Sequence, residues 1–424
     1  MSQAGLISAS SRRLVRLPAA LQLRDFRRFW IGETVSLFGD QITLIALPLV
    51  GVLALHASPA QMGFLGAAEL FPNLLFSLHA GALVDRRGRR RQTMIFAALG
   101  RAALLLTIPV AYAFGGLTLT QLYVVGFLVG TLSVLFYVSY MTLFVSLVPR
   151  ERYLEANSLL NGSRAFSFVG GPSVGGLLVQ ILSAPAALVA DAVSFLASAL
   201  AMKSIDPAEP PTEEAERGHL KAGMKYLWSS SVIRASLLAT ATINFFNFVF
   251  WALFILYATR ALGVHPGALG LVLGAASVGG VLGSIFAGRI SRRMGVGPAF
   301  VLGCVLFPTP LVLVPLAGGA HWQILAFLFA AEFLSGFGVM ILDITAGSIK
   351  AALVPDRLRA RVSGAYMVVN YGVRPLGALV GGALGAWIGL RPTLWIASVG
   401  AIAGVLWLLP SPLLRLRDLP DVEE

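Results

Sequence analysis

The sequence is poor in charged side chains and in cysteine. Only 12% of its 424 residues are charged and 57% are hydrophobic, and the mean hydropathy is +0.81. A water-soluble domain carries roughly 25% charged residues, so this composition excludes a soluble class of protein. The single cysteine, Cys304, excludes an internal disulfide and makes redox chemistry an unexpected function.

Residue spacings typical of metal and nucleotide sites are also absent. None of the four lysines follows a glycine, which excludes a phosphate-binding loop ending in Gly-Lys-Ser or Gly-Lys-Thr. The zinc-protease pattern His-Glu-x-x-His does not occur, so an intramembrane enzyme is only a weak alternative. The five histidines lie too far apart in the sequence to indicate a metal site: His56, His79, His219, His265 and His321. We therefore expect no metal and no cofactor.

What the chain does contain is a series of long apolar runs. Crossing about 30 Å of hydrocarbon takes about 18 or more apolar residues in a helix, and an open strand edge cannot remain unpaired in lipid. The sequence therefore predicts an all-α polytopic membrane protein with twelve transmembrane helices. The predicted spans are 30–55, 61–84, 92–115, 118–148, 157–182, 185–202, 232–258, 267–288, 297–317, 321–348, 362–388 and 392–410.

Lysine and arginine are distributed unevenly between the loops. If the N-terminus is cytoplasmic, the seven inside segments hold 26 of the 32 basic residues, and the outside loops hold only Arg260 and Arg391. Excess positive charge in short loops marks the cytoplasmic side, so both termini are expected inside the cell. This placement also argues against nucleic-acid binding as the reason for the net charge of +12. Residues 1–28 show no compact apolar stretch before a small-residue cleavage site and are read as a cytoplasmic lead.

The longest polar stretch divides the chain near its middle. It is rich in proline and glutamate at first, and then Leu220, Met224, Leu227 and Trp228 follow at helical spacing. That spacing indicates a short amphipathic helix on the membrane surface, or alternatively a solvated linker. The expected segments are a lead (1–29), a six-helix bundle (30–202), a cytoplasmic linker (203–231), a second six-helix bundle (232–410) and a tail (411–424).

The two halves resemble each other at a constant offset. A shift of 206 places Gly175-Gly176 on Gly381-Gly382, and a shift of 207 places Gly88 on Gly295. Duplicated six-helix halves are typical of secondary transporters, which bind their substrate near the midplane between the halves.

The loop after the second span reads Gly81-Ala-Leu-Val-Asp85-Arg86-Arg87-Gly88-Arg89-Arg90-Arg91. It resembles the signature of the major facilitator superfamily, Gly-x-x-x-Asp-Arg-x-Gly-Arg-Arg, between helices 2 and 3. The resemblance implies that Asp85 helps lock the two halves at the cytoplasmic face and that Gly88 permits a tight turn. The corresponding segment Gly288 to Gly295 lacks the aspartate, which implies a weaker gate there.

The fifth span contains Gly170-Gly171-Pro172-Ser-Val-Gly175-Gly176. It resembles the core of the antiporter motif of drug-exporting members, in which proline kinks the helix and glycines allow close packing. The stretches around Arg24-Asp25-Phe26 and Val148-Pro149 are similar to the bacterial branch that holds macrolide, tetracycline and enterobactin exporters. This resemblance favours export over uptake.

Ionisable side chains inside spans are costly and mark functional positions. Their depth along the spans suggests that Arg101 balances Asp40 or Glu69 and that Glu332 pairs with Arg374. In the superfamily, helices 1, 4, 7 and 10 line the cavity, which favours Asp40 and Glu332 as coupling groups. Asp191 and Arg164, nearer the membrane faces, are expected to be structural. The candidate coupling and substrate residues are Asp40, Glu69, Glu332, Asp343, Arg101 and Arg374.

Aromatic and amide side chains on two spans are candidates to line a cavity. Amides facing lipid would lack hydrogen-bond partners, so Asn244 and Asn247 are expected to face inward. Trp251 on the same span, and Tyr137 and Tyr140 on the fourth, are aromatic candidates.

Taken together, these patterns predict a secondary active transporter in a bacterial inner (plasma) membrane. The expected activity is proton-coupled efflux of a lipophilic small molecule by alternating access, and one chain, as a monomer, holds the complete path. Its expected partners are membrane lipid, the substrate and protons. A nutrient symporter or a lipid transporter of the same fold is the main alternative.

Overall fold

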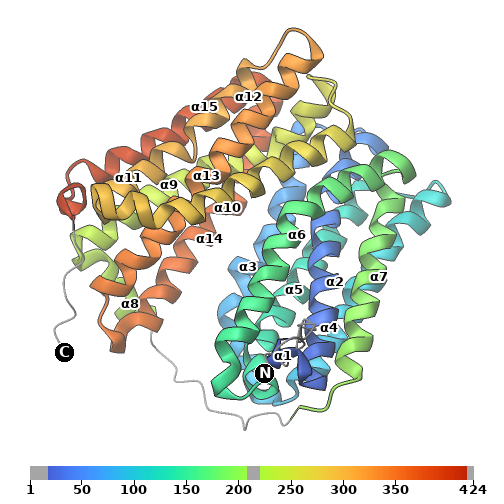
Figure 1. Cartoon of the computed structure of the whole chain (residues 1–424). Helices are drawn as coiled ribbons and strands as arrows, with labels where there is room; N and C mark the ends of the chain where they lie inside the picture. Colours follow the sequence, from blue (N-terminus) through green and yellow to red (C-terminus); the bar gives the residue numbers. More distant parts are fainter. Residues whose placement is uncertain (1–17, 208–219, 418–424) are drawn as a thin grey trace, which may run out of the picture.

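The structure of the chain, a computed structural model, describes residues 18–207 and 220–417 and is built of helices (Figure 1). A first group of helices lies before the central linker and a second group after it. The first group comprises α1 (Ala19–Gln22), α2 (Arg24–Leu49) with a π-turn (Val50–Ala54), α3 (Pro59–Arg87), α4 (Arg90–Ala113), α5 (Leu119–Leu147), α6 (Tyr153–Leu182) and α7 (Ala184–Lys203). The second comprises α8 (Leu220–Ser229), α9 (Ser231–Arg260), α10 (Pro266–Met294), α11 (Val296–Leu306), α12 (Leu313–Leu316), α13 (His321–Leu353), α14 (Asp356–Trp387) and α15 (Leu390–Ala403).

Within the described ranges, ten helical segments are long and apolar enough to cross a membrane. The others of comparable length are α3, with 29 residues, and α14, with 32 residues. These two helices pack on each other across the two groups.

Several helices extend beyond the apolar runs in the sequence. Relative to the predicted spans, α2 and α14 begin six residues earlier, and α10 ends six residues later. All three extensions lie at the end of the molecule that carries the arginine-rich loops, here named the basic end. Hydropathy ends where polar side chains begin, whereas the backbone hydrogen bonds of the helix continue.

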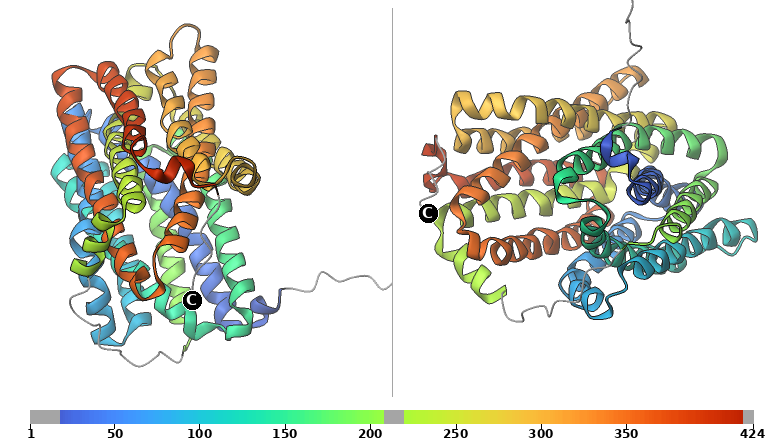
Figure 2. Two further views of the ribbon diagram at one scale, coloured as in Figure 1. Left: turned by 90° about the vertical axis from the view of Figure 1, so that its left-hand side faces the viewer. Right: turned by 60° about the horizontal axis from the view of Figure 1, so that its bottom comes forward.

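The two groups of helices meet at the end opposite the basic end, here named the closed end. In Figures 1 and 2 they incline toward one another, and their main contacts are α6 with α10 and α3 with α14. At the closed end Arg260 donates a hydrogen bond to the carbonyl oxygen of Val52 (3.2 Å), which joins α9 to the turn after α2.

Both main contacts are built on a pair of facing glycines. An added Cβ on Gly176 of α6 would lie 2.8 Å from the Cα of Gly270 on α10, and one on Gly63 of α3 would lie 2.5 Å from the Cα of Gly382 on α14. Gly176 and Gly382 are 206 residues apart, and Gly63 and Gly270 are 207 apart. The two crossings are therefore the same contact formed twice, and each joins a helix of the first copy of the sequence repeat to a helix of the second.

The outer surface of the helices is strongly apolar. Leu200 on α7 and Ile181 on α6 are 67% and 69% exposed, and an aqueous surface rarely carries such side chains over several helices. Phe114, Trp322 and Trp387 are the most exposed aromatics and all lie at helix ends on the closed side. Aromatic side chains gather at membrane interfaces, so this surface is that of a multi-pass membrane protein.

Helix α8 follows the linker, where the sequence suggests an amphipathic helix. Its Leu227 is fully buried, and Tyr226 donates a hydrogen bond to the carbonyl oxygen of Leu353 at the end of α13 (2.6 Å). An added Cβ on Gly223 would meet the carbonyl oxygen of Arg361 at 2.2 Å, so α8 lies directly on α14. Helix α8 is therefore fixed to the second group.

Candidate functional site

Two cavities lie along the interface between the groups. The first, of about 410 Å³, is close to the closed end, and the second, of about 560 Å³, lies further toward the basic end on α2, α3 and α14. Helices α2, α3, α4, α5, α6, α9, α10 and α14 contribute to them, whereas α13 contributes no residue to either lining. The tenth span therefore does not border these two cavities as the resemblance implied.

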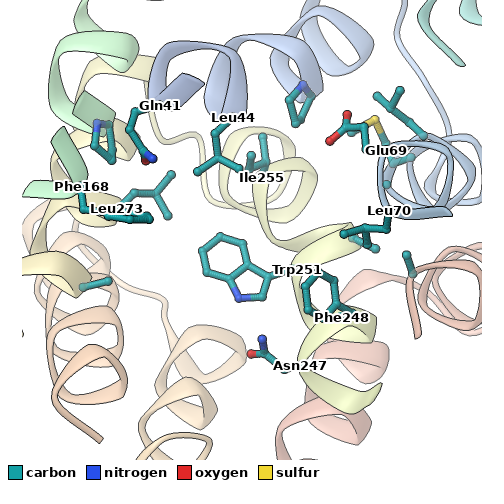
Figure 3. A pocket seen from close by; sticks show the side chains of 18 of the residues that line it. Gln41, Leu44, Glu69, Leu70, Phe168, Asn247, Phe248, Trp251, Ile255 and Leu273 are labelled. Atoms are coloured by element: carbon teal, nitrogen blue, oxygen red, sulfur yellow. The ribbon is translucent and has the colours of Figure 1, made fainter. Parts of the chain in front are cut away.

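The first cavity is apolar apart from a few side chains that point into it. Figure 3 shows Trp251 of α9 projecting into its centre, with Gln41 and Glu69 reaching in from the first group and Asn247 from α9. Oε1 of Glu69 and Oδ1 of Asn247 are shielded from solvent and have no hydrogen-bond partner among the described residues. A carboxylate and an amide in apolar surroundings can orient a lipophilic ligand that supplies the missing donors.

Glu69 has this position because α5 approaches α3 closely. An added Cβ on Gly126 of α5 would lie 3.1 Å from Cγ of Glu69, and one on Gly130 would lie 3.0 Å from Pro72. These glycines leave room for the glutamate stem between the two helices.

The second cavity carries most of the charge of the site. Its lining includes Glu33 and Asp40 of α2, Arg101 of α4 and Arg164 of α6. Arg164 was expected to be structural, and Glu33 was not among the candidates. Helix α2 begins six residues before the predicted span, so Glu33 lies well inside the helix and two turns from Asp40 on the same face. That seven-residue spacing was the sequence pattern that could have identified it.

Arg101 meets Asp40, one of the two partners that the sequence suggests. Its Nη1 lies 3.7 Å from Oδ1 of Asp40, and its side chain is 3% exposed whereas that of Asp40 is 44% exposed. The guanidinium lies over the rings of Phe136 and Phe195, 4.5 and 4.0 Å from their centroids. Two cation–π contacts hold the arginine in place while its carboxylate partner remains open to the cavity.

Asp191 of α7 lies beside this pair, away from the cavity. It is fully buried and accepts hydrogen bonds from the hydroxyls of Thr43 and of Ser194, the latter at 2.9 Å. An added Cβ on Gly39 would lie 2.2 Å from its Oδ1, so this glycine allows the carboxyl group to sit against α2 next to Asp40.

In the second group, the predicted pairing of Glu332 with Arg374 is wrong. Glu332 is 2% exposed and its Oε1 has no hydrogen-bond partner in the described ranges. Arg374 instead stacks on Tyr371, 4.1 Å from its centroid, and on Phe248, and Asp343 is the carboxylate that acts on it electrostatically. Equal depth on two helices does not place two side chains on facing sides.

Two of the expected cavity residues pack elsewhere. Asn244 donates a hydrogen bond to Oδ1 of Asn370 on α14 (3.0 Å), and Tyr140 is buried and stacks on Phe29 at 5.3 Å. The amide group of Asn244 therefore has its hydrogen-bond partner on the neighbouring helix α14. The other three candidates, Asn247, Trp251 and Tyr137, do line the cavities.

The motif between α3 and α4 is described only in part. The side chains of 77–87, and with them Gly81, Asp85 and Arg86, lie outside the described residues. Gly88 has φ +59° and Gly295, its counterpart 207 residues later, has φ +96°, so a glycine with positive φ follows both α3 and α10. Arg89 is exposed and Arg90 is buried in this turn.

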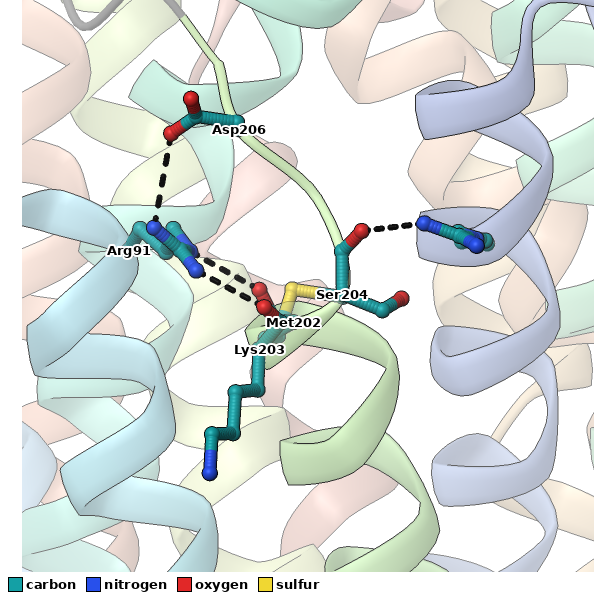
Figure 4. A network of polar contacts seen from close by, with 6 residues as sticks. Arg91, Met202, Lys203, Ser204 and Asp206 are labelled. Atoms are coloured by element: carbon teal, nitrogen blue, oxygen red, sulfur yellow. Dashed lines mark hydrogen bonds and ion pairs between the residues drawn. The ribbon is translucent and has the colours of Figure 1, made fainter.

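Arg91 connects the start of α4 to the end of α7 (Figure 4). It donates hydrogen bonds to the carbonyl oxygens of Met202 (3.0 Å) and Lys203 (2.8 Å) and forms an ion pair with Asp206 (3.6 Å). Arg28 of α2 donates to the carbonyl oxygen of Ser204. This network ties the last residues before the linker to the first group.

The glycines of the antiporter-like motif serve two interfaces. Added Cβ atoms on Gly171 and Gly175 would meet Gln41 at 2.5 Å and the Cα of Ile42 at 3.0 Å, so this face of α6 packs on α2. Gly176 faces α10, and the carbonyl oxygen of Pro172 lies 2.4 Å from the Cβ position of Gly270. The motif thus links the charged helix α2 to the crossing between the groups.

Two repeated groups of helices around a shared cavity define a membrane transporter with the major facilitator fold. The family model described as "Transmembrane secretion effector" (MFS_3) matches residues 18–422, and the chain belongs to this family. It is a transporter and not an enzyme.

Curated relatives cover nearly the whole chain. The multidrug efflux pump Tap of Mycolicibacterium fortuitum is 28% identical over 90% of this chain and 93% of its own length. Tap of Mycobacterium tuberculosis strain H37Rv is 26% identical over 90% and 92%. The uncharacterized MFS-type transporter YfiS of Bacillus subtilis is 25% identical over 85% and 86%.

Solved structures are similar in fold. The nucleoside transporter NupG aligns with a TM-score of 0.73 at 12% identity, covering 91% of this chain and 99% of its own. A bacterial homologue of the iron transporter ferroportin in an inward-facing state aligns with a TM-score of 0.71 at 15% identity, covering 92% and 98%. At such identities the likeness concerns the fold alone.

Proposed function

We propose that this chain is a proton-coupled exporter of lipophilic small molecules that crosses a bacterial inner membrane twelve times, with both termini in the cytoplasm. The observation that carries the proposal is the Asp40–Arg101 pair, in which a fixed, buried cation faces a carboxylate that opens onto the cavity. Such a carboxylate can be occupied by a proton or by a positively charged ligand, but not by both. Competition for this one carboxylate couples the movement of the proton to the movement of the ligand.

The apolar first cavity supports a lipophilic substrate. Trp251 and Phe248 offer flat apolar faces, and Glu69 and Asn247 supply unpartnered oxygens. The names of the Tap relatives as multidrug efflux pumps agree with this substrate class and with the direction of transport. With the basic end in the cytoplasm, the second cavity faces inward, where an exporter collects its substrate.

The energy balance is sufficient for a useful gradient. One charge that crosses 100 mV releases about 2.3 kcal/mol. A tenfold solute gradient costs about 1.4 kcal/mol. A single exchanged proton per substrate therefore sustains a gradient of several tens-fold, and no cofactor is needed.

Transport into everted membrane vesicles tests the proposal. Vesicles energised with a proton gradient are expected to accumulate a lipophilic cationic dye, and Asp40→Asn is expected to abolish accumulation at unchanged expression, because the exchangeable carboxylate is gone. Asp206→Asn is the matched control, since its carboxylate is 99% exposed outside the membrane helices. Full activity in Asp40→Asn would remove Asp40 from the mechanism, and concentrative uptake of solute by intact cells would indicate a symporter.

A further inference from the structure

The buried carboxyl group of Asp191 is not accounted for by an exchange at Asp40 alone. It lies on α7, lines neither cavity, and receives hydroxyl groups from Thr43 of α2 and Ser194 of α7. The neighbouring Gly39 has no side chain to separate it from the helix that carries Asp40. Its surroundings therefore connect it to the helix that carries the coupling residue.

One arginine serves both carboxyl groups. Asp40, Asp191 and Glu33 act electrostatically on Arg101, and the charged groups that act on Asp191 are Asp40 and Arg101. The arginine uses Nη1 toward Asp40, while its Nε and Nη2 are buried without a hydrogen-bond partner in the described part of the chain. Phe195, one of the two rings that hold the guanidinium, is one helical turn from Asp191 on the same face of α7.

Around Asp40, two cations, Arg101 and Arg164, lie beside three carboxyl groups, Glu33, Asp40 and Asp191, so one negative charge is left uncompensated. Two carboxyl groups in such proximity titrate as a pair and share a proton. With Asp40 bound to Arg101, the group left with hydroxyl partners is Asp191, and it is the one that can hold the proton.

We propose that Asp191 is the second carboxyl group of the coupling site and that Arg101 alternates between Asp191 and Asp40. The inference rests on the proposed function and adds to it a second group that holds the proton before it moves to Asp40. In the exchange step, the O–H bond of the Asp191 carboxylic acid breaks and an O–H bond forms on the Asp40 carboxylate. The N–H donors of Arg101 move from Asp40 to Asp191 at the same time, so the net charge does not change. The proton then leaves Asp40 into the second cavity.

The pH profile of transport by the reconstituted full-length protein separates this role from a structural one. Asp191→Asn keeps the shape of the side chain, and a hydroxyl that turns round can accept from the new NH2 group, but the titratable carboxyl group is lost and Arg101 stays on Asp40. We expect the half-maximal point of proton-driven transport to move to lower pH by about one unit, which is a tenfold change in proton concentration. Dye binding without a gradient should stay within about twofold, since neither cavity is lined by Asp191.

Ser194→Ala is the matched control, because it removes a hydrogen bond to Asp191 and keeps the carboxyl group. We expect its pH profile to stay close to that of the unmodified protein. If Asp191 is only structural, both variants lower the amount of folded protein and neither moves the profile. An unchanged profile in Asp191→Asn therefore overturns the proposal.

An infrared titration answers the question even where Asp191→Asn fails to fold. The carboxylic-acid band of Asp191 is identified in the folded Ser194→Ala variant as the band that changes frequency. We expect this band to titrate together with the band that Asp40→Asn removes. If the carboxylic-acid band of Asp191 does not change with pH, the proposal is refuted. The titration uses neither substrate nor gradient, so it stays informative if vesicles show no proton-driven transport and the proposed function itself fails.

Discussion

Glu69 is the residue that gives the apolar cavity its charge. Its Oε1 is shielded and unpartnered, and no ion pair involving Glu69 is found among the described residues. Arg101, by contrast, is already matched by Asp40. A cationic ligand can therefore complement Glu69 without displacing a residue of the protein.

We predict that Glu69→Gln changes substrate selectivity. Transport of lipophilic cations is expected to fall at least about tenfold, the equivalent of one lost charged contact, while uncharged lipophilic compounds remain substrates. Competition assays in energised vesicles, with a cationic and an uncharged dye of similar size, measure the ratio of their transport rates.

Glu332→Gln is the control for that experiment, since Oε1 of Glu332 is also shielded and without a hydrogen-bond partner among the described residues, but Glu332 lines neither cavity. It should leave the ratio unchanged. An equal loss of both dyes in Glu69→Gln would mean that Glu69 supports the cavity wall and does not select charge.

At the same scale, the sequence predicts which ionisable residues lie in the membrane but only part of how they pair. Depth along a helix follows directly from residue number, and the contact between Arg101 and Asp40 was accessible in this way. The direction in which a side chain points around the helix axis cannot be predicted in this way, because it depends on tertiary packing. The predicted pairing of Glu332 with Arg374 is wrong for this reason. The sequence places Asp191 nearer a membrane face and gives no sign of its contact with Gly39, because a contact between two helices cannot be read from residue spacing within one of them.

At the scale of elements, the glycine pairs decide where the two groups of helices touch. The crossing of α6 with α10 and that of α3 with α14 both bring backbones together without intervening side chains. Close backbone approach through small residues is a main source of helix association in membranes. The sequence repeat indicated Gly176 and Gly382, but their partners Gly270 and Gly63 appear only in the fold.

We predict that Gly176→Val opens the closed end. A branched side chain there would overlap Gly270 and the carbonyl oxygen of Pro266, and overpacking of this kind costs about 1–3 kcal/mol. That is enough to shift a two-state equilibrium about 5- to 150-fold. Spin labels at Phe114→Cys and Trp322→Cys, in a Cys304→Ser background, should report longer distances between the groups.

Gly162→Val on the same helix is the control, because nothing lies within 4 Å of its Cβ position. It should leave the label distances unchanged. If Gly176→Val also gives the original distances, other contacts hold the closed end.

At the scale of the whole molecule, the composition and loop charges predict a polytopic helical protein, and the fold of this family agrees. Hydropathy underestimates the helices at the basic end, since polar residues continue them beyond the lipid. The orientation in the membrane rests on the arginines, and it decides toward which compartment the second cavity opens.

We predict that the basic end faces the cytoplasm. In the Cys304→Ser background, an impermeant maleimide should label Phe114→Cys and Trp322→Cys in intact cells, because both side chains are exposed at the closed end. Arg89→Cys, also exposed, should react only after the membrane is permeabilised. Labelling of Arg89→Cys in intact cells would invert the topology and the direction of transport with it.

The network around Arg91 has a mechanical consequence. It anchors the chain at Asp206 to the first group, whereas Tyr226 and Gly223 anchor α8 to the second. Between Asp206 and Leu220 there are fourteen peptide links, whose full reach is about 50 Å. This tether sets the largest stroke that the covalent chain allows between the two halves, so each residue deleted from it shortens the permitted stroke by about 3.5 Å.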